Sequence, residues 1–347
     1  MNSMQHSRIA RSIFAAAAFA LVLPLGAARA QDKTYEMKIS TPTINAAPDR
    51  FARNYAAALG KDSGGRIKAE VFPASQLGSI ARQIEGTQFG AIQCEVVPPE
   101  FMVGIDERFG VLAAPGLVSS MEQGQRVAAD PAVQKLMLSL GGDKGLRGVG
   151  LFMAEPSEII AKNPIRHLAD FKGKKLRIFA SDFQSVALER LGATPVAMSL
   201  GDVLPALQQG AIDGAVAGMQ VFSGMHFFDA AKYITLTHQP AIFIVAEVNK
   251  KWYDSLPADL QKIIDRDAIE QSMAMVPQAI ELVNTARKGW TEHGGELIDL
   301  PADENTEMLK ILASVGRDVS SKSPALSAAY QIVTDAAARA AAQTASR

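Results

Sequence analysis

The chain has 347 residues, of which 48% are hydrophobic and 20% are charged, and its formal net charge is -1 at pH 7. This length is enough for about two domains with separate cores. The near-neutral charge, without any basic run interleaved with aromatic residues, argues against a nucleic-acid partner. With one cysteine, Cys94, the chain forms no internal disulfide and depends on its core for stability.

The first thirty residues have the pattern of a secretory signal peptide. Arg8 and Arg11 form a positive n-region, residues 13–25 are almost continuously apolar, and Ala28-Arg29-Ala30 is an A-x-A cleavage site. The alternative, a membrane anchor, is disfavoured because an apolar run of about 13 residues is too short to span a bilayer of roughly 30 Å. We therefore expect residues 1–30 to be removed after Ala30 and the mature chain to be exported.

Strands and helices alternate in the first part of the mature chain. The patterns predict strands at residues 35–40, 66–72 and 91–97, with helices at 51–59 and 79–89 between them. This order predicts a mostly parallel sheet covered by helices. Cys94 lies in the third strand, where we expect a buried, inert thiol in preference to a catalytic thiolate.

A second unit of the same kind follows. Residues 120–140 predict a helix pair, and 148–153 and 159–161 predict two further strands. Strands at 175–180, 194–198 and 212–217 then alternate with helices at 181–191 and 203–209. Two similar α/β units predict two similar lobes.

The last third of the chain begins with residues 233–248, which alternate over an unusual length with a break near His238-Gln239-Pro240. A long strand that runs from one lobe to the other fits this pattern. We expect a helix over 257–292 kinked at Pro277, a strand at 297–300, and two final helices over 302–316 and 323–342.

Arg177 is the strongest candidate for a ligand contact. In the run from Gly173 to Ala180, Arg177 and Phe179 alternate with Leu176 and Ile178, so the arginine and the ring share one face of a strand. A guanidinium offers paired N–H donors in a fixed fork and keeps its charge at physiological pH, which suits a carboxylate ligand. The alternative is a strand-end arginine in a surface ion pair.

Several short motifs then resemble one family, the periplasmic solute-binding subunits of TRAP (tripartite ATP-independent periplasmic) transporters of the DctP type, over residues 33 to about 325. In the first lobe they are Ser63-Gly64-Gly65-Arg66-Ile67, Phe72-Pro73-x-x-Gln76-Leu77-Gly78 and Glu85-Gly86-x-x-x-Gly90-Ala91-Ile92. The later ones are Phe171-x-Gly173-x-Lys175-Leu176-Arg177-Ile178, Gly192-Ala193-Thr194-Pro195-Val196, Leu207-Gln208-x-Gly210-x-Ile212-Asp213-Gly214, and Trp252 with Leu256, Pro257, Leu260 and Gln261. Their joint order and spacing is specific, although each motif alone is weak.

The resemblance implies a two-lobed periplasmic-binding-protein-like α/β fold with discontinuous lobes, a hinge and long C-terminal helices. We assign residues 31–153 with 244–285 to the first lobe, and 154–243 with 286–347 to the second. In the family, the counterpart of Arg177 pairs with the ligand's carboxylate. The resemblance further implies a periplasmic protein, without a cofactor, that delivers a small organic acid to integral membrane TRAP permease subunits, and we expect a monomer.

Two departures from the family concern the ligand. Many sugar-acid and dicarboxylate binders of the family have a second arginine shortly before the strand at 159–160, but residues 154–158 contain none. Many also have an asparagine where Ala217 and Gly218 stand here. Fewer polar groups favour a less polar ligand, such as an aromatic or branched monocarboxylate.

The remaining candidates surround these positions. Glu155 or Glu158 would bind the amino group of an amino-acid-like ligand, unless both are solvated loop residues. Met219 and Phe222 are apolar wall residues or ordinary core. The complete set of expected ligand contacts is Arg177, Phe179, Gln220, Met219, Phe222, Glu155 and Pro98.

Catalysis has little support in the sequence. It contains no G-x-S-x-G elbow, no H-E-x-x-H and no Cys/His metal spacing, and its histidines are scattered. The glycines at 145, 148 and 150 have the wrong spacing for a dinucleotide fingerprint. We expect a binding protein that is not an enzyme, while a receptor that feeds a signalling partner stays open as an alternative to a transporter subunit.

Overall fold

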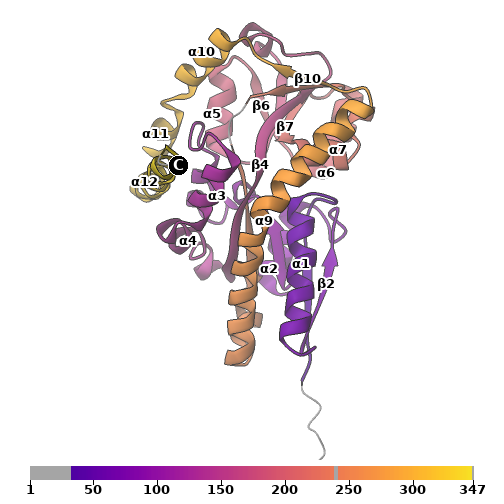
Figure 1. Ribbon diagram of the computed structural model, residues 1–347, viewed down its shortest axis with the longest axis vertical. Helices are drawn as coiled ribbons and strands as arrows, with labels where there is room; N and C mark the ends of the chain where they lie inside the picture. The colour runs from indigo at the N-terminus through magenta and orange to yellow at the C-terminus, as the bar shows by residue number, and fades with distance from the viewer. Residues whose placement is uncertain (1–32, 238–240, 346–347) are drawn as a thin grey trace, which may run out of the picture. The chain divides into compact units, whose positions relative to one another are not determined.

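The computed structural model describes residues 33–237 and 241–345, whose strands form two β-sheets that meet at one long shared strand (Figure 1). The signal peptide expected over residues 1–30 lies outside the described residues. Within the described ranges, none of the helices combines the length and the apolar character needed to cross a bilayer. The α/β class predicted from the sequence is confirmed.

The first sheet has the strand order β2-β1-β3-β9-β4. It comprises β1 (Tyr35–Ser40), β2 (Ile67–Phe72), β3 (Cys94–Val97), β9 (Ala241–Asn249) and the first part of β4 (Leu146–Ala161). Strand β1 is parallel to both β2 and β3, as predicted, whereas β9 runs antiparallel to β3 and to β4. Every residue of β9 is buried, which explains its nearly continuous apolar sequence.

The second sheet contains the end of β4, then β7, β5 and β6 in that order, with β8 on the other side of β4 and β10 beyond it. Its further strands are β5 (Lys175–Ile178), β6 (Thr194–Ala197), β7 (Gly214–Gly218), β8 (Tyr233–Leu236) and β10 (Glu296–Asp299). Strand β5 is parallel to β6 and β7, and β4 is antiparallel to β7 and β8. The second α/β unit is therefore confirmed.

Strand β4 differs from its prediction. The sequence predicts two strands at 148–153 and 159–161, but the structure has one strand of 16 residues. Its first part pairs with β9 as far as Pro156, and from Ser157 onward it pairs with β7. The polar segment 154–158, which contains a proline, gave no strand signal because prolines and buried charges are unusual inside a sheet.

The long strand predicted over residues 233–248 is wrong. Strand β8 belongs to the second sheet and β9 to the first, and residues 238–240 between them lie outside the described residues. Periodicity alone does not distinguish two consecutive strands from one long strand. The strand that passes from one sheet to the other is β4.

Helices cover both sheets. They are α1 (Ala47–Asp62), α2 (Ile80–Phe89), α3 (Met121–Ala129), α4 (Pro131–Met137), α5 (Asp182–Arg190), α6 (Leu200–Gln209), α7 (Met219–Gly224), α8 (Lys250–Asp254), α9 (Ala258–Glu292), α10 (Ala302–Leu312), α11 (Val315–Ser320) and α12 (Pro324–Ala345). The described residues also form five short 3-10 helices: η1 (Pro99–Met102), η2 (Glu107–Ala113), η3 (Gly142–Lys144), η4 (Leu168–Phe171) and η5 (Phe227–Asp229). The predicted final helix at 302–316 is divided into α10 and α11.

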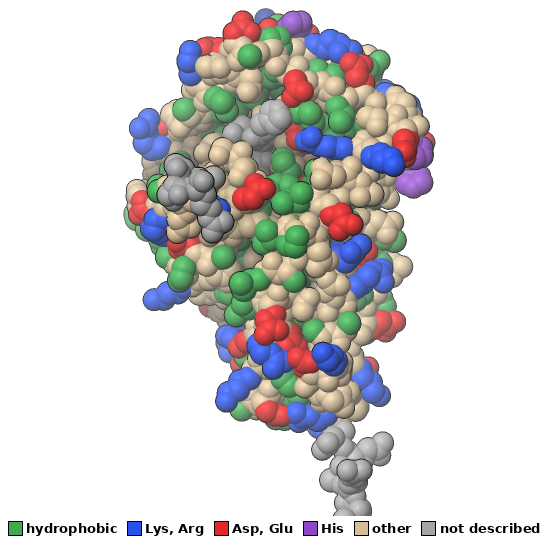
Figure 2. Space-filling view, in the orientation of Figure 1, with side chains coloured by type: hydrophobic (Ala, Val, Ile, Leu, Met, Phe, Trp, Pro, Cys, Tyr) green, Lys and Arg blue, Asp and Glu red, His purple; other side chains and the backbone are tan. Residues whose placement is uncertain are grey.

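Helix α9 has 35 residues, continues through Pro277, and packs on β4, α1 and α7. Figure 2 shows hydrophobic side chains gathered on the face along which α9 runs. Ile269 and Met273 are 48% and 65% exposed there. They line an open surface groove between α9, α3 and α4.

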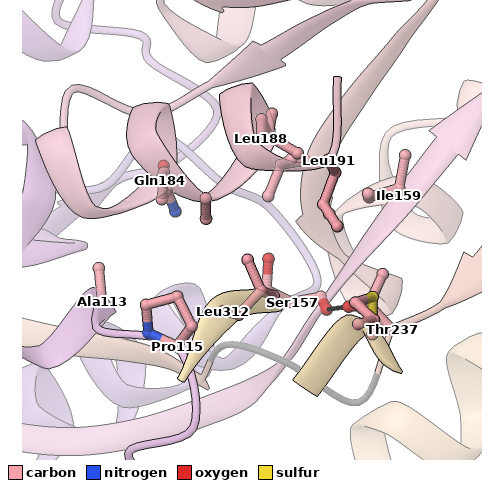
Figure 3. Close-up of a pocket in the computed structure, with 12 residues that line it drawn as sticks. Ala113, Pro115, Ser157, Ile159, Gln184, Leu188, Leu191, Thr237 and Leu312 are labelled. Atoms are coloured by element: carbon pink, nitrogen blue, oxygen red, sulfur yellow. Dashed lines mark hydrogen bonds between the residues drawn. The ribbon is translucent and has the colours of Figure 1, made fainter. Parts of the chain in front are cut away.

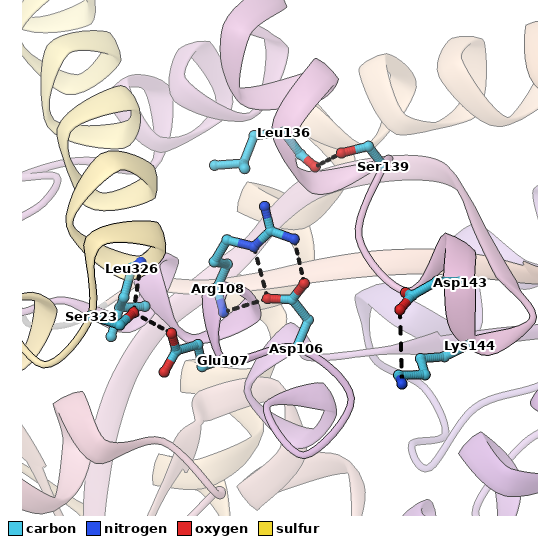
Figure 4. A network of polar contacts seen from close by, with 9 residues as sticks. All are labelled: Asp106, Glu107, Arg108, Leu136, Ser139, Asp143, Lys144, Ser323 and Leu326. Atoms are coloured by element: carbon cyan, nitrogen blue, oxygen red, sulfur yellow. Dashed lines mark hydrogen bonds and ion pairs between the residues drawn. The ribbon is translucent and has the colours of Figure 1, made fainter.

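The last helix, α12, is attached to elements from the first half of the chain. At its start, Ser323 hydrogen-bonds to the carboxylate of Glu107 in η2 (Figure 4). Near its end, Arg339 forms an ion pair with Asp130 at 2.7 Å, beside α3 and α4. The sequence assigned residues 286–347 to the second lobe; β10 does pair with β8 of the second sheet, but α12 packs on α3 and η2. The lobe boundaries stay a prediction.

Two glutamates face each other inside the first sheet, because Glu95 on β3 pairs in register with Glu247 on β9. Both are buried, and no carboxylate oxygen of either has a hydrogen-bond partner. The Thr87 hydroxyl beside Glu95 donates to the carbonyl oxygen of Gln83. Burial raises the pKa of both carboxyls well above the usual range, and in Glu247 nearby Arg147 opposes this only in part.

Candidate functional site

Arg177 lies on β5, between β6 and β7 in the second sheet. The predicted alternation is confirmed, since Leu176 and Ile178 pack into an apolar cluster on one face of the strand and Arg177 occupies the other. The side chain of Arg177 is 0% exposed. This burial excludes the surface ion pair that the sequence left open.

Backbone carbonyl groups, and no carboxylate, hold the guanidinium of Arg177. Its Nε donates to the carbonyl oxygen of Met198 at 2.9 Å, and Nη1 donates to that of Val216 at 3.0 Å. Its Nη2 is buried without a hydrogen-bond partner. Burial lowers the pKa of Arg177 to about 9, so it stays protonated at neutral pH. A fixed, buried cation with a free N–H donor is a site for an external anion.

Two phenyl rings cover the guanidinium. Its carbon lies 4.8 Å from the ring centre of Phe179 and 5.8 Å from that of Phe101. The two rings stack on each other with centres 5.1 Å apart. Phe179 was predicted as a ligand contact, whereas Phe101, on η1 after β3, was not. Rings at these distances favour the cation and exclude water from it.

These groups line a cavity between the two sheets, with a volume of about 30 Å³. Ala154 and Glu155 come from the shared strand β4. From the second sheet and its helices come Arg177, Phe179, Leu200, Ala217, Gly218 and Val221; from the first come Pro42, Thr43, Pro48, Ile80, Pro98, Phe101, Ile242 and Ile244. Thr43, Glu155 and Arg177 are the polar side chains among them. The volume holds about one water molecule, so an organic acid enters only when the walls move apart.

Glu155 is buried in β4 and is not a solvated loop residue. Its Oε2 accepts a hydrogen bond of 2.8 Å from the backbone N–H of Gln220 at the start of α7. Burial, with a smaller contribution from the neighbouring Glu158, raises the pKa of Glu155 to about 8 against the opposing effect of the Gln220 N–H. The carboxyl group therefore has a strong tendency to hold a proton when the cavity is empty.

Gly218 has no side chain, and this leaves the space that the carboxyl group of Glu155 occupies. A Cβ atom at this position would lie 1.9 Å from the carboxyl carbon of Glu155. We expect Gly218→Ala to displace Glu155, break its bond to Gln220 and lower the free energy of unfolding by about 1–3 kcal/mol. Thermal unfolding and ligand titration measure both effects. The matched control is Gly201→Ala in α6, where nothing lies within 4 Å; wild-type stability and binding in Gly218→Ala would contradict the expectation.

The other predicted contacts stand behind the cavity wall. Gln220 accepts from the N–H of Ala47 at 2.7 Å and donates to the carbonyl oxygen of Ala154 at 3.2 Å, so it joins the start of α1 to β4. Met219 and Phe222 are buried, and the ring of Phe222 packs against Phe227 with centres 5.6 Å apart. These three are not among the lining residues; Pro98 is.

Glu158 is also buried in β4, and its Oε2 accepts from the N–H of Thr237 at 2.8 Å. It does not line the cavity. A second cavity of about 40 Å³ lies nearby between α5, β4, β7 and α10 (Figure 3). Its walls are mainly apolar, and Thr237 there donates to the carbonyl oxygen of Ser157 at 2.9 Å. None of the described residues that line this second cavity carries a charge.

The described residues contain no group of three His, Cys, Asp or Glu side chains placed to hold a metal ion. Cys94 is buried as predicted, and burial raises the pKa of its thiol well above the usual value. The arrangement of one buried cation, one buried carboxyl and apolar walls is that of a small-molecule binding site.

Comparison with known proteins gives the family of this chain. The family model described as bacterial extracellular solute-binding protein, family 7 (DctP), matches residues 40–322. The chain therefore belongs to this family, which confirms the resemblance seen in the sequence. It is a family of solute-binding proteins and not of enzymes.

Individual relatives are distant in sequence and close in fold. The 2,3-diketo-L-gulonate-binding periplasmic protein YiaO of Escherichia coli is 25% identical over 74% of this chain and 75% of its own. A TRAP periplasmic solute-binding protein of Desulfovibrio salexigens with bound orotic acid is 22% identical, covers 88% of this chain and 100% of its own, and has a TM-score of 0.83. One of Ochrobacterium anthropi with bound L-fuconate is 27% identical over 88% and 99%, with a TM-score of 0.79. These matches confirm the two-lobed fold.

Proposed function

We propose that the mature chain is the solute-binding subunit of a TRAP-type transporter and captures a small carboxylate-bearing organic acid in the cavity around Arg177. The observation that carries this proposal is the buried guanidinium of Arg177, whose Nη2 has no partner in the structure. A ligand carboxylate would accept from Nη2 and pair with the charge in a dry environment, where such a pair is strong. Phe179, Phe101 and Pro98 would contact the rest of the ligand.

The finer part of the proposal is that the ligand is an apolar monocarboxylate, aromatic or branched. Of the lining side chains, Thr43, Glu155 and Arg177 are polar and the others are apolar. A polyhydroxylated ligand would bury several hydroxyl groups without partners, each at a cost of about 1–3 kcal/mol. The sequence also predicts contacts from Gln220, Met219 and Phe222. A ligand could reach these three residues only if opening of the cavity exposed them.

A sugar acid is the second candidate. The relatives named above include a protein that binds 2,3-diketo-L-gulonate and a structure with bound L-fuconate. Backbone groups exposed by opening of the cavity would then have to supply the hydrogen bonds that the lining side chains lack. The two candidates differ in the polarity of the ligand and agree on Arg177.

The proposal also includes export of the chain to the periplasm and its protein partners in the membrane. The signal peptide would direct the chain to the periplasm, with cleavage after Ala30, and the ligand-bound form would be recognised by integral membrane TRAP permease subunits. We propose a monomer that needs no cofactor, binds no nucleic acid and carries out no reaction. A receptor for a signalling partner would use the same site.

A thermal-shift screen of residues 31–347 tests the ligand class, because a ligand that binds only the folded state raises the melting temperature. The protein is first unfolded and refolded to remove any ligand retained from the host cell. The panel contains aromatic and branched monocarboxylates, sugar acids, dicarboxylates and amino acids. We expect shifts with apolar monocarboxylates. Shifts confined to sugar acids or dicarboxylates would overturn the apolar ligand, and no shift with any acid would overturn the function.

A further inference from the structure

We propose that Glu155 binds an ammonium group, so that the ligand is an apolar amino acid whose carboxylate pairs with Arg177. This inference rests on the proposed function and narrows its ligand. It starts from two polar atoms of opposite character in one small cavity. Arg177 Nη2 is a buried donor without a partner. In the same cavity, Glu155 is held through Oε2 by the Gln220 N–H, and its Oε1 makes no hydrogen bond to the described residues.

Arg177 and Glu155 do not satisfy each other. No hydrogen bond or ion pair joins them, and each is held in place by its own backbone partners: the carbonyl groups of Met198 and Val216 for the arginine, and the N–H of Gln220 for the glutamate. Groups fixed in this way keep their positions when the cavity is empty. They are therefore preorganised for a ligand that carries complementary groups of its own.

A zwitterion pairs with both groups as ions, whereas a plain monocarboxylate pairs with Arg177 and offers no cation to an ionised Glu155. With a monocarboxylate bound, the free oxygen of Glu155 would be sealed in an apolar cavity beside the ligand. A buried polar group without a partner is costly, and a charge-assisted hydrogen bond removes that cost. The charges also balance, since Arg177 meets the carboxylate and Glu155 meets the ammonium group. The apolar walls leave an aliphatic or aromatic side chain as the remainder of the ligand.

Binding would be linked to a proton. The charged and polar groups near Glu155 are Glu158 from its own strand, the Gln220 N–H from α7 and Arg177 from β5, which lines the same cavity. Because the pKa of Glu155 in the empty protein is raised to about 8, the carboxyl has to lose its proton when an ammonium group binds below that pH. Affinity for an amino acid should therefore rise with pH toward 8, and each binding event should release a proton.

Matched ligand pairs test the inference by calorimetry. Leucine, phenylalanine and alanine are each compared with the acid that lacks the amino group: 4-methylpentanoate, 3-phenylpropanoate and propanoate. For at least one pair we expect the amino acid to bind roughly tenfold tighter or more. Titrations at pH 6.5 in buffers of different ionisation enthalpy should show release of a proton.

Two variants locate the effect. Glu155→Gln should remove both the preference for the amino acid and the release of the proton, while the amino-free acid still binds. Glu158→Gln is the matched control, a buried glutamate on the same strand that does not line the cavity, and it should keep the preference. A preference that survives in Glu155→Gln would overturn the inference.

The outcomes separate this inference from the proposed function. If the amino-free acids, or sugar acids alone, bind the wild type as tightly as or tighter than the amino acids, Glu155 does not bind an ammonium group, and the carboxylate function stands. If no carboxylate of any class binds the refolded protein, both the function and the inference fail.

Discussion

Arg177→Ala is expected to weaken binding of the carboxylate ligand by about 3–5 kcal/mol, roughly 10²-fold or more. The variant leaves a buried carboxylate without its cation, which is the costly way to break such a pair. Calorimetry with the ligand identified in the thermal-shift screen measures the loss. Arg177→Lys should recover part of the affinity, because a lysine restores the charge without the forked donors.

The fold should persist in Arg177→Ala, because the loss of two hydrogen bonds and of the contacts with Phe101 and Phe179 is offset in part by removal of a buried charge. Circular dichroism and thermal unfolding of the variant check this. Arg82→Ala is the control, since Arg82 is an exposed residue of α2 whose side chain makes only a surface ion pair with Glu85. Near-wild-type affinity in Arg177→Ala would contradict the assignment of the carboxylate site.

Glu247→Gln is expected to raise the free energy of unfolding at pH 8 by about 2–4 kcal/mol and to change it little at pH 5. In the folded chain Glu247 and Glu95 are buried side by side, and burial raises the pKa of both. Each favours its protonated form there, whereas each ionises above a pH of about 4.3 in the unfolded chain. Their stabilising contribution is complete at low pH and is lost as the pH rises through the folded-state pKa values.

The slope of this loss is about 1.4 kcal/mol per pH unit for each carboxyl group that is protonated only in the folded state. Denaturant unfolding of the wild type between pH 5 and pH 8.5 should show the decline, and Glu247→Gln should flatten it. Glu85→Gln, on the exposed surface of α2, is the control and should follow the wild type. Equal slopes for the wild type and Glu247→Gln would show that Glu247 is ionised in the folded chain.

The strand that contains Arg177 could be predicted because apolar and charged residues alternate strictly over its four residues. This alternation determines which side chains share a face of the strand. Leu176 and Ile178 needed an apolar partner surface, so Arg177 had to point the other way. Its full burial was not predictable, because it depends on Phe101 and on carbonyl groups of β7 and of the segment after β6. These contacts join residues that are distant in the sequence.

The segment 154–158 could not be predicted as part of a strand for the same reason. Buried Glu155 and Glu158 look like loop residues until the N–H groups of Gln220 and Thr237 are placed beside them. Phe101 was missed because a short 3-10 helix has no periodicity that marks its faces. One signal was available: Phe101 follows the end of β3, and ligand sites in α/β sheets lie outside the carboxyl ends of the strands.

Strand β4 determines what kind of movement can open the cavity. Its hydrogen-bond ladders hold it to β9 on one stretch and to β7 on the next, so a movement that separates the two sheets would twist the β4 backbone. One of the two register shifts in its ladder with β9, between Met153 and Glu155, lies directly beside the cavity wall. A twist of β4 at this register shift would therefore occur next to Glu155, which lines the cavity. A ligand bound to Glu155 would then contact the same segment of β4 that bends when the cavity closes.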